Sequence, residues 1–125
     1  MLDIINKRMK EQGVKNIKTV MGTITDPKLP PNSQDLILMV DVYHEFEHPF
    51  EMTEKMVDAL KPGGRLVFVE FRLEDDKVPI KLVHKMSERQ VVKEMVPFPE
   101  MEHTKTYKDL PWQHVITFAR QAAKK

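Results

Sequence analysis

The sequence predicts an α/β protein with a mostly parallel sheet, flanked by helices and completed by a C-terminal antiparallel hairpin. Apolar runs at 35–42 and 66–71 are typical of buried strands, and a helical repeat at 49–60 lies between them. Neighbouring parallel strands need a crossover of a dozen or more residues, and this helix supplies one. The chain has 125 residues, so we expect a single domain over 1–125.

Composition excludes several classes of function. The 20 basic and 19 acidic residues leave a net charge of +1, which provides no global field for binding nucleic acid. No apolar run approaches the ~18 residues of a membrane-spanning helix. Cysteine is absent, so disulfides and Cys-based zinc sites are excluded, and no secretory leader is evident. We therefore expect a cytoplasmic protein without nucleic-acid or membrane partners.

The N-terminal third predicts a helix, a strand and a turn-rich loop. Leu2, Ile5 and Met9 recur at helical spacing over residues 1–12, and Gly13 is a suitable C-terminal cap. The run 17–21 favours a short strand. A helix that starts at the first residue lacks an N-cap, so we interpret it as part of a helix cut from a longer protein.

The middle of the chain predicts the centre of the sheet. Asp35 to Val42 is a continuous apolar run bounded by carboxylates, which is typical of a central strand covered on both faces. Pro49 suits the first turn of the next helix, whose buried face we assign to Met52, Met56, Ala59 and Leu60. Pro62-Gly63-Gly64 should end that helix.

The C-terminal part predicts a helix and a hairpin. The run 79–86 is apolar enough for a covering helix or lid, and Ser87 with Gln90 forms a capping box for a further helix that buries Val91 and Met95. Strands at 101–108 and 114–119 should pair in antiparallel fashion.

One segment, His44-Glu45-Phe46-Glu47-His48, matches the H-E-x-x-H pattern of zinc hydrolases. That chemistry needs both histidines on one face of a helix, with the glutamate as general base. Pro49 disfavours helical backbone at His48, and the segment directly follows a predicted strand. We therefore favour a loop at the strand end and expect no metal ligands here, with a zinc-dependent hydrolase as the alternative.

Three segments in this order resemble the class I S-adenosylmethionine-dependent methyltransferases. They are Gly22-Thr23 after a strand, Asp35 to Val40 followed by Asp41-Val42-Tyr43-His44-Glu45, and Leu60-Lys61-Pro62-Gly63-Gly64 before the next strand. The similarity continues through Met86 to Gln90 and Leu110 to His114, and so covers nearly the whole chain. It implies a partial Rossmann-like methyltransferase fold, with S-adenosylmethionine as cofactor.

The resemblance also implies a site at the carboxyl ends of two strands. The residues expected to contact the cofactor are Gly22, Thr23, Ile24, Val40, Asp41, Val42 and Tyr43. His44 would lie over the transferred methyl group or position the methyl acceptor, which is an unidentified small molecule or other nucleophile. Tyr107 and Trp112 would line the acceptor site, or else pack in the core or the hairpin.

The sequence departs from the family pattern at its start. It contains no acidic, glycine-rich first-strand turn and no acidic residue at the end of a second strand, so we expect a truncated form that binds S-adenosylmethionine weakly or not at all. In the family, strand four pairs with strand one, so the edge of Asp35 to Val42 should be unpaired. We therefore expect a homo-oligomer, in particular a dimer, unless the 17–21 strand moves inward. A non-catalytic fragment that self-associates is the second alternative.

Overall fold

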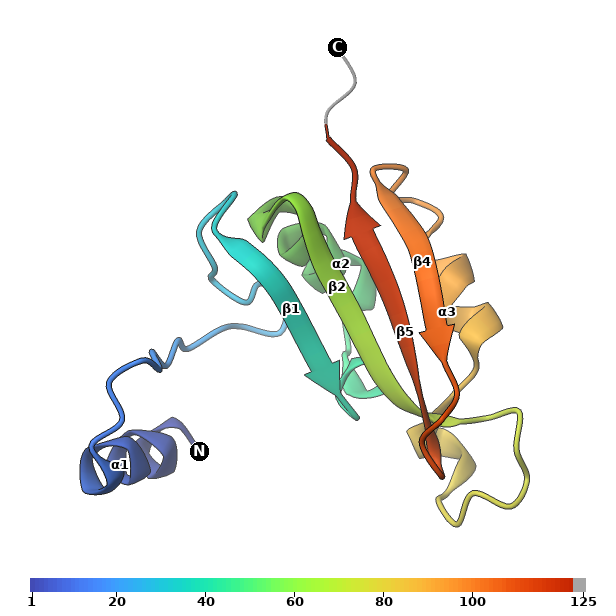
Figure 1. The fold of residues 1–125 in the computed structure, drawn as a ribbon, viewed down its shortest axis with the longest axis horizontal. Helices are drawn as coiled ribbons and strands as arrows, with labels where there is room; N and C mark the ends of the chain where they lie inside the picture. Colours follow the sequence, from blue (N-terminus) through green and yellow to red (C-terminus); the bar gives the residue numbers. More distant parts are fainter. Residues whose placement is uncertain (123–125) are drawn as a thin grey trace.

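The computed structural model describes residues 1–122 as a mixed sheet with helices on one face and an N-terminal helix that stands apart (Figure 1). The sheet order is β1-β2-β5-β4, and β3 pairs with the end of β2. In chain order the elements are α1 (Leu2–Gln12), β1 (Gln34–Val40), η1 (Tyr43–Glu45), α2 (Pro49–Ala59), β2 (Leu60–Arg72), η2 (Leu82–His84), β3 (Lys85–Met86), α3 (Glu88–Met95), β4 (Met101–Tyr107) and β5 (Gln113–Arg120).

Strand pairing centres on β2. It pairs in parallel with β1 and β3 and in antiparallel fashion with β5, which also pairs with β4. Gln34 is opposite Leu60 but Leu36 is opposite Arg65, so the start of β2 bulges. Gly64 permits this bulge, because a Cβ there would lie 2.8 Å from the Lys61 carbonyl oxygen and 3.0 Å from that of Gln34. The predicted α/β class and C-terminal hairpin are confirmed, and the sheet is mixed.

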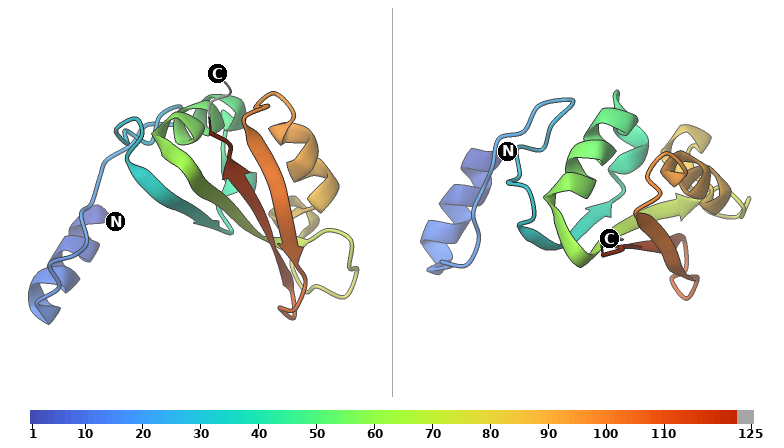
Figure 2. Two further views of the ribbon diagram at one scale, coloured as in Figure 1. Left: turned by 45° about the horizontal axis from the view of Figure 1, so that its top comes forward. Right: turned by 90° about the horizontal axis from the view of Figure 1, so that it is seen from above.

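The core lies between one face of the sheet and helices α2 and α3, which share that face (Figure 2). Leu66, Phe68 and Ile116 are fully buried at the sheet. Phe68 makes edge-to-face contacts with Tyr43 and Phe118 at ring-centroid distances of 4.8 and 5.7 Å. The helices contribute Met56, Val57, Val91 and Met95.

Local signals for the helix ends are confirmed. Gly13 closes α1 in the left-handed conformation at φ 66°, and Pro49 opens α2. The Ser87 hydroxyl accepts a hydrogen bond from the Gln90 backbone N–H at 3.0 Å, which caps α3 as predicted. By contrast, 79–86 is not a covering helix. It forms only η2 and β3, and Leu82 and Val83 are exposed, because the lysines and histidine of this run break any apolar helical face.

The predicted strand at 17–21 is wrong. These residues form an irregular segment in which Ile17 and Met21 are exposed. A strand needs a hydrogen-bonded neighbour, and within residues 1–122 no other strand pairs with this segment. It does not move beside β1 either, so the sheet lacks the further parallel strand that the sequence predicted.

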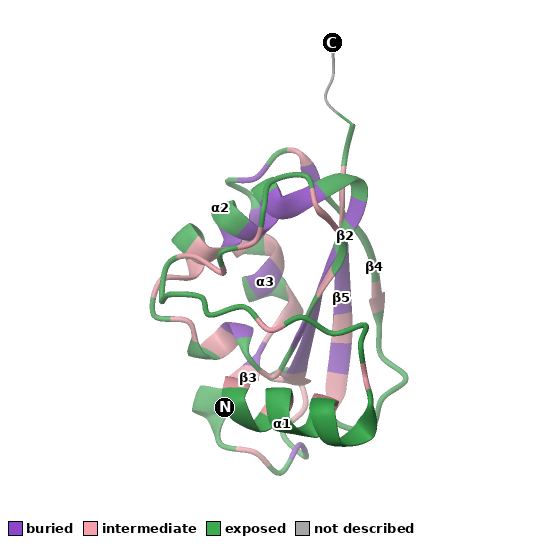
Figure 3. Ribbon diagram, turned by 90° about the vertical axis from the view of Figure 1, so that its left-hand side faces the viewer, coloured by how far each residue is buried: buried purple, intermediate pink, exposed green. Residues whose placement is uncertain are grey.

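The unpaired edge expected for Asp35 to Val42 is confirmed within the described residues, whereas only one face of this strand is covered. Within the described chain β1 pairs only with β2, and its side chains alternate. Met39 is buried, whereas the opposite face exposes Leu36, Leu38 and Val40 by 45–56%. The expectation of two covered faces fails because α1 stands away from the sheet, with none of its residues buried (Figure 3). No described helix is long and apolar enough to cross a membrane.

Helix α2 ends against a cation from the sheet. The Arg120 guanidinium, at the end of β5, donates Nη1 hydrogen bonds to the carbonyl oxygens of Val57 (2.9 Å), Asp58 (3.4 Å) and Leu60. The last carbonyls of a helix have no partners within the helix and carry partial negative charge. Arg120 therefore connects the covering helix to the central pair of strands.

We predict that the isolated chain self-associates through the β1 edge, with a second copy as the partner. The seven residues of β1 have no partner on their outer edge within the described chain, and this edge adjoins an exposed apolar face, which favours such pairing. A lysine on β1 opposes pairing of two copies, because it places a charge on the exposed apolar face. Leu38→Lys should therefore shift the mass measured by light scattering after size exclusion to that of a monomer. Val96→Lys places the same charge at another exposed apolar position and should leave the assembly intact. A monomeric wild-type chain would contradict the prediction.

We also predict that Arg120→Met lowers the free energy of unfolding by about 2 kcal/mol, since hydrogen bonds to charged groups contribute about 1.5–3 kcal/mol. Methionine keeps most of the apolar stem, so the loss reports the bonds to the α2 carbonyls. Urea denaturation provides the measurement. Arg89→Met on the exposed face of α3 is the matched control, and an equal loss in that variant would contradict the capping role.

Candidate functional site

The carboxyl ends of β1 and β2 meet at one edge of the sheet, where open α/β sheets bind ligands. Asp41 follows β1 directly, with its backbone N–H bonded to the Val69 carbonyl oxygen at 2.8 Å. Its φ of 53° is left-handed, a conformation that aspartate tolerates better than most residues. Gln113 Nε2 donates to Asp41 Oδ2 at 2.7 Å. The other oxygen, Oδ1, is buried and has no hydrogen-bond partner among the described residues.

A second pair of residues connects the next loop to β2. Glu70 is fully buried, and both of its carboxylate oxygens contact His44. The His44 backbone N–H donates to Oε1 at 3.1 Å, and its Nδ1 lies 2.6 Å from Oε2. Burial raises the pKa of the Glu70 carboxyl, while the hydrogen bonds from His44, and the positive charge that its imidazole carries when protonated, act against that rise.

The contact with Glu70 selects the tautomer of His44. A carboxylate accepts hydrogen bonds, so the ring proton of a neutral imidazole belongs on Nδ1. Nε2 is then left with a free lone pair. The His44 side chain is 8% exposed, which means that this lone pair is held in a nearly buried ring of defined orientation.

His44 borders an open pocket of about 290 Å³. Tyr43, in the same pocket, donates its hydroxyl hydrogen bond to Glu94 Oε1 at 3.1 Å. Burial and the nearby Glu94 charge raise the Tyr43 pKa, which keeps the phenol neutral. Other lining residues are Phe46, Pro49, Leu73, Val83, Lys85, Met86, Ser87 and Gln90. The pocket thus combines apolar and polar side chains around His44.

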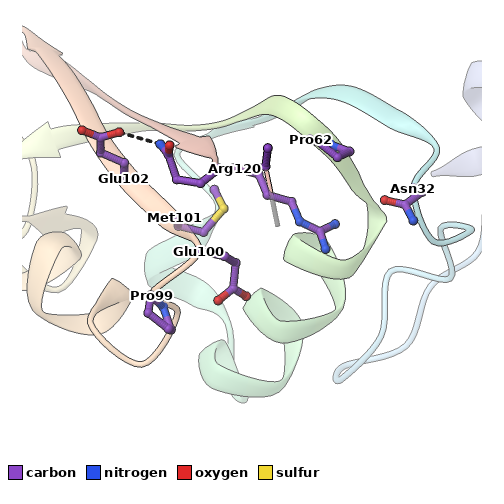
Figure 4. A pocket seen from close by; sticks show the side chains of 9 residues that line it. Asn32, Pro62, Pro99, Glu100, Met101, Glu102 and Arg120 are labelled. Atoms are coloured by element: carbon purple, nitrogen blue, oxygen red, sulfur yellow. Dashed lines mark hydrogen bonds between the residues drawn. The ribbon is translucent and has the colours of Figure 1, made fainter. Parts of the chain in front are cut away.

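A larger pocket of about 850 Å³ lies at the opposite edge of the sheet, where β1 and β2 begin (Figure 4). Asn32, Pro62 and Arg120 line one side, and Glu100 and Glu102 the other. The Arg120 guanidinium already binds the carbonyls at the end of α2. Because ligands of parallel α/β sheets bind at the carboxyl ends of strands, we place the functional site at the smaller pocket.

The structure divides the predicted cofactor residues into two groups. Val40, Asp41, Val42 and Tyr43 lie together at the end of β1, next to His44, the predicted catalytic residue. The remaining residues, Gly22, Thr23 and Ile24, lie in the segment between α1 and β1. Thr23 hydrogen-bonds only to Thr25 and Asp26 within the described chain, and no described hydrogen bond joins the two groups.

Sequence reasoning missed two residues of this site, Glu70 and Gln113. A carboxylate inside the apolar run of β2 was a usable signal, since a buried charge requires a partner. Gln113 carried no comparable signal, because only the pairing of β5 with β2 brings it to Asp41. Tyr107 and Trp112 are 43% and 45% exposed, so neither belongs to the core; Tyr107 lies under Lys105 Nζ at 4.5 Å in the hairpin.

The zinc-hydrolase interpretation of His44 to His48 does not fit the backbone. His44 lies in η1, whereas His48 precedes Pro49 with φ −129°, and α2 begins only at Pro49. The two histidines therefore do not share a helical face. The favoured interpretation, a loop at the strand end, is confirmed.

Comparisons with solved structures place this architecture among methyltransferases. The chain is similar to a SAM-dependent methyltransferase from Aquifex aeolicus (18% identity, TM-score 0.81), covering 91% of this chain and 60% of that one. It is also similar to a putative type 11 methyltransferase from Sulfolobus solfataricus (18% identity, TM-score 0.73), covering 100% of this chain and 70% of that one. At these identities the likeness shows the fold. The chain thus spans 60% of the length of the Aquifex protein.

Sequence comparisons agree. A curated relative, ribosomal RNA small subunit methyltransferase H 1 of Agathobacter rectalis, is 49% identical over 41 residues, or 33% of this chain and 12% of the relative. A family model described as "Methyltransferase domain" matches residues 1–68, more than half of the 125 residues. The chain therefore belongs to the methyltransferase domain family, and its resemblance to the class I S-adenosylmethionine-dependent enzymes is confirmed.

Proposed function

We propose that this chain contributes to S-adenosylmethionine-dependent methylation of a hydroxyl-bearing acceptor. In this proposal Asp41 binds the amino-acid end of the cofactor, and His44 receives the proton of the acceptor. The observation that carries the proposal is the buried Asp41 Oδ1, which has no hydrogen-bond partner in the described chain at the strand end where this family binds its cofactor.

The chemistry of Asp41 fits the cofactor. A buried carboxylate oxygen without a partner is costly, and a positively charged donor relieves that cost. The α-ammonium group of S-adenosylmethionine is such a donor, and the bound cofactor supplies an activated methyl group on its sulfonium. Gln113 holds the other oxygen, Oδ2, so Oδ1 has a defined direction. Asp41 is thereby oriented before any ligand binds.

The affinity of this chain for the cofactor should be low. Contacts to the ribose and a close backbone approach need an acidic residue and a glycine-rich turn, and the sequence contains neither in the family's arrangement. The Gly22 to Ile24 segment has no described hydrogen bond to the Asp41 group. Asp41 and its neighbours thus supply one end of a cofactor site.

His44 favours a hydroxyl acceptor over an amine. An alcohol or phenol must lose its proton as the methyl group arrives, whereas a neutral amine attacks through its own lone pair. The Nε2 lone pair, fixed by the Nδ1 contact with Glu70, is suited to take that proton. The small pocket beside it, lined by both apolar and polar side chains, would orient the acceptor, and orientation supplies much of the rate in methyl transfer.

We predict that Asp41→Asn weakens S-adenosylmethionine binding about tenfold, because a hydrogen bond to a charged group contributes about 1.5–3 kcal/mol. Calorimetric titration or ligand-observed NMR at high cofactor concentration measures it. Asp35→Asn is the matched control, since its side chain is 85% exposed near the other end of the same strand. A wild-type Kd in the low micromolar range would contradict the expected weak binding, and equal affinities in both variants would exclude the Asp41 contact.

We further predict that His44→Gln lowers methyl transfer to simple phenols by about 10²–10⁴-fold, the usual contribution of general base catalysis. His48→Gln should retain the wild-type rate, since His48 precedes α2 and makes no described contact with Glu70. Transfer is measured with saturating cofactor against paired phenol and primary-amine acceptors. Preferential methylation of the amines, or an unchanged rate in His44→Gln, would contradict the proton-acceptor role.

A further inference from the structure

Three metal-ligand side chains gather on the outer side of His44. His44 Nε2 lies 3.8 Å from Glu45 Oε1, and His84 Nδ1 lies 3.8 Å from the same oxygen. All three ligand atoms lie within 4.8 Å of one another. His84 arrives from η2, which the fold brings against η1, and the two imidazole rings meet edge to face at 5.5 Å.

We propose that His44, Glu45 and His84 bind a first-row transition-metal ion, with Zn²⁺ as the representative species. The ion would hold the same Nε2 lone pair that we assign to proton acceptance, so that its binding inhibits methyl transfer. The inhibition rests on the proposed function, whereas the metal site itself does not.

The donor set determines the class of metal. Two imidazole nitrogens and one carboxylate oxygen suit zinc and its neighbours, whereas Mg²⁺ and Ca²⁺ prefer oxygen ligands. With metal–ligand bonds of about 2.1 Å, two ligands of a tetrahedral ion lie about 3.4 Å apart. The two 3.8 Å separations from Glu45 therefore need small adjustments, and the two imidazole nitrogens, which lie within 4.8 Å of each other, must approach further.

The two ligands that must adjust are able to do so. The side chains of Glu45 and His84 are 63% and 46% exposed, so rotation about their side-chain bonds meets little resistance. His44, at 8% exposure, is the fixed member. The ion would thus sit at the surface, with three protein ligands and a remaining position for water, as in zinc sites with an open coordination position.

Glu70 supplies the support that such a site needs. Histidine ligands of metals almost always donate their other ring N–H to a carboxylate or carbonyl, which fixes the tautomer and makes the ligand more basic. His44 Nδ1 lies 2.6 Å from the buried Glu70 carboxylate, so Nε2 is already directed at Glu45 and His84. This carboxylate–histidine pair distinguishes the cluster from a chance group of surface side chains.

The proposed site differs from the rejected H-E-x-x-H site in its ligands. Glu45 is a ligand here, where the hydrolase pattern uses it as a base, and His84 takes the place of His48. The sequence predicted no metal ligand because His84 lies 40 positions from His44, in a segment with no motif of its own.

Zinc titration of the chain, purified without an affinity tag, tests the site directly. Calorimetry with zinc chloride should show one ion per chain with a Kd of about 10 μM or tighter. His84→Gln should weaken binding by about tenfold or more, and Glu70→Gln by about 10–100-fold through loss of the supporting carboxylate. Thermal melts of each apo variant establish that the fold is retained.

Two of the remaining histidines provide matched controls. His48→Gln and His103→Gln each remove one imidazole outside the cluster, and both should bind zinc as the wild type does. Zinc binding that needs millimolar concentrations in the wild type would overturn the proposal. A loss in His48→Gln as large as that in His84→Gln would overturn it too, in favour of the hydrolase-type pair.

Inhibition is measured separately. Zinc should abolish methyl transfer to a phenol in the wild type at the concentrations that saturate the site, and His84→Gln should require about tenfold more zinc for half-inhibition, measured against the zinc-free rate of that variant. Zinc that binds without inhibiting would overturn the competition at His44. Absence of methyl transfer from the chain would refute the proposed function and leave the calorimetric result on the metal site intact.

Discussion

Strand β2 is the constraint on which the rest of the structure depends. It pairs with three other strands, and it carries Leu66 and Phe68 into the core beneath α2 and α3. A strand buried on this scale needs each backbone group paired and each polar side chain satisfied. Glu70 is the deeply buried charged residue of this strand, and its two carboxylate oxygens are satisfied by hydrogen bonds with His44. The position of the candidate site therefore follows from the strand that organises the sheet.

The contact between Glu70 and His44 stabilises the fold and also fixes the chemical state of the imidazole. Because both carboxylate oxygens bind donors of a single residue, the loop after β1 is held against β2 and the imidazole is held in one tautomer. The free Nε2 lone pair is the feature on which both proposals rest, since it can receive a proton or bind a metal ion. Glu45 and His84 favour binding of a metal ion, whereas an acceptor bound in the pocket would supply the proton.

The N-terminal part of the chain is less well packed than the site around Glu70 and His44. Helix α1 buries none of its residues, and β1 exposes Leu36, Leu38 and Val40 on the face away from α2. The two groups of predicted cofactor residues have no described hydrogen bond between them. The candidate site is thus assembled around Asp41 and His44 at the end of β1, while the exposed β1 face and edge favour association with a second copy.

Local patterns in the sequence were enough to determine helices α1, α2 and α3, the hairpin and the approximate class of the fold, although they wrongly favoured a covering helix at 79–86. Gly13, Pro49 and Ser87 act on backbone within a few residues, so their effects on helix ends need no distant partner. Asp41 and His44 were also identifiable, because they follow a strand. The resemblance to the family predicted the unpaired edge of β1, but tertiary structure alone decided that 17–21 is no strand and that one face of β1 is uncovered, since both depend on which neighbour is present. It alone brought Gln113 to Asp41 and His84 to His44, because contacts between residues 72 and 40 positions apart are set by strand pairing and loop packing, which no local pattern encodes.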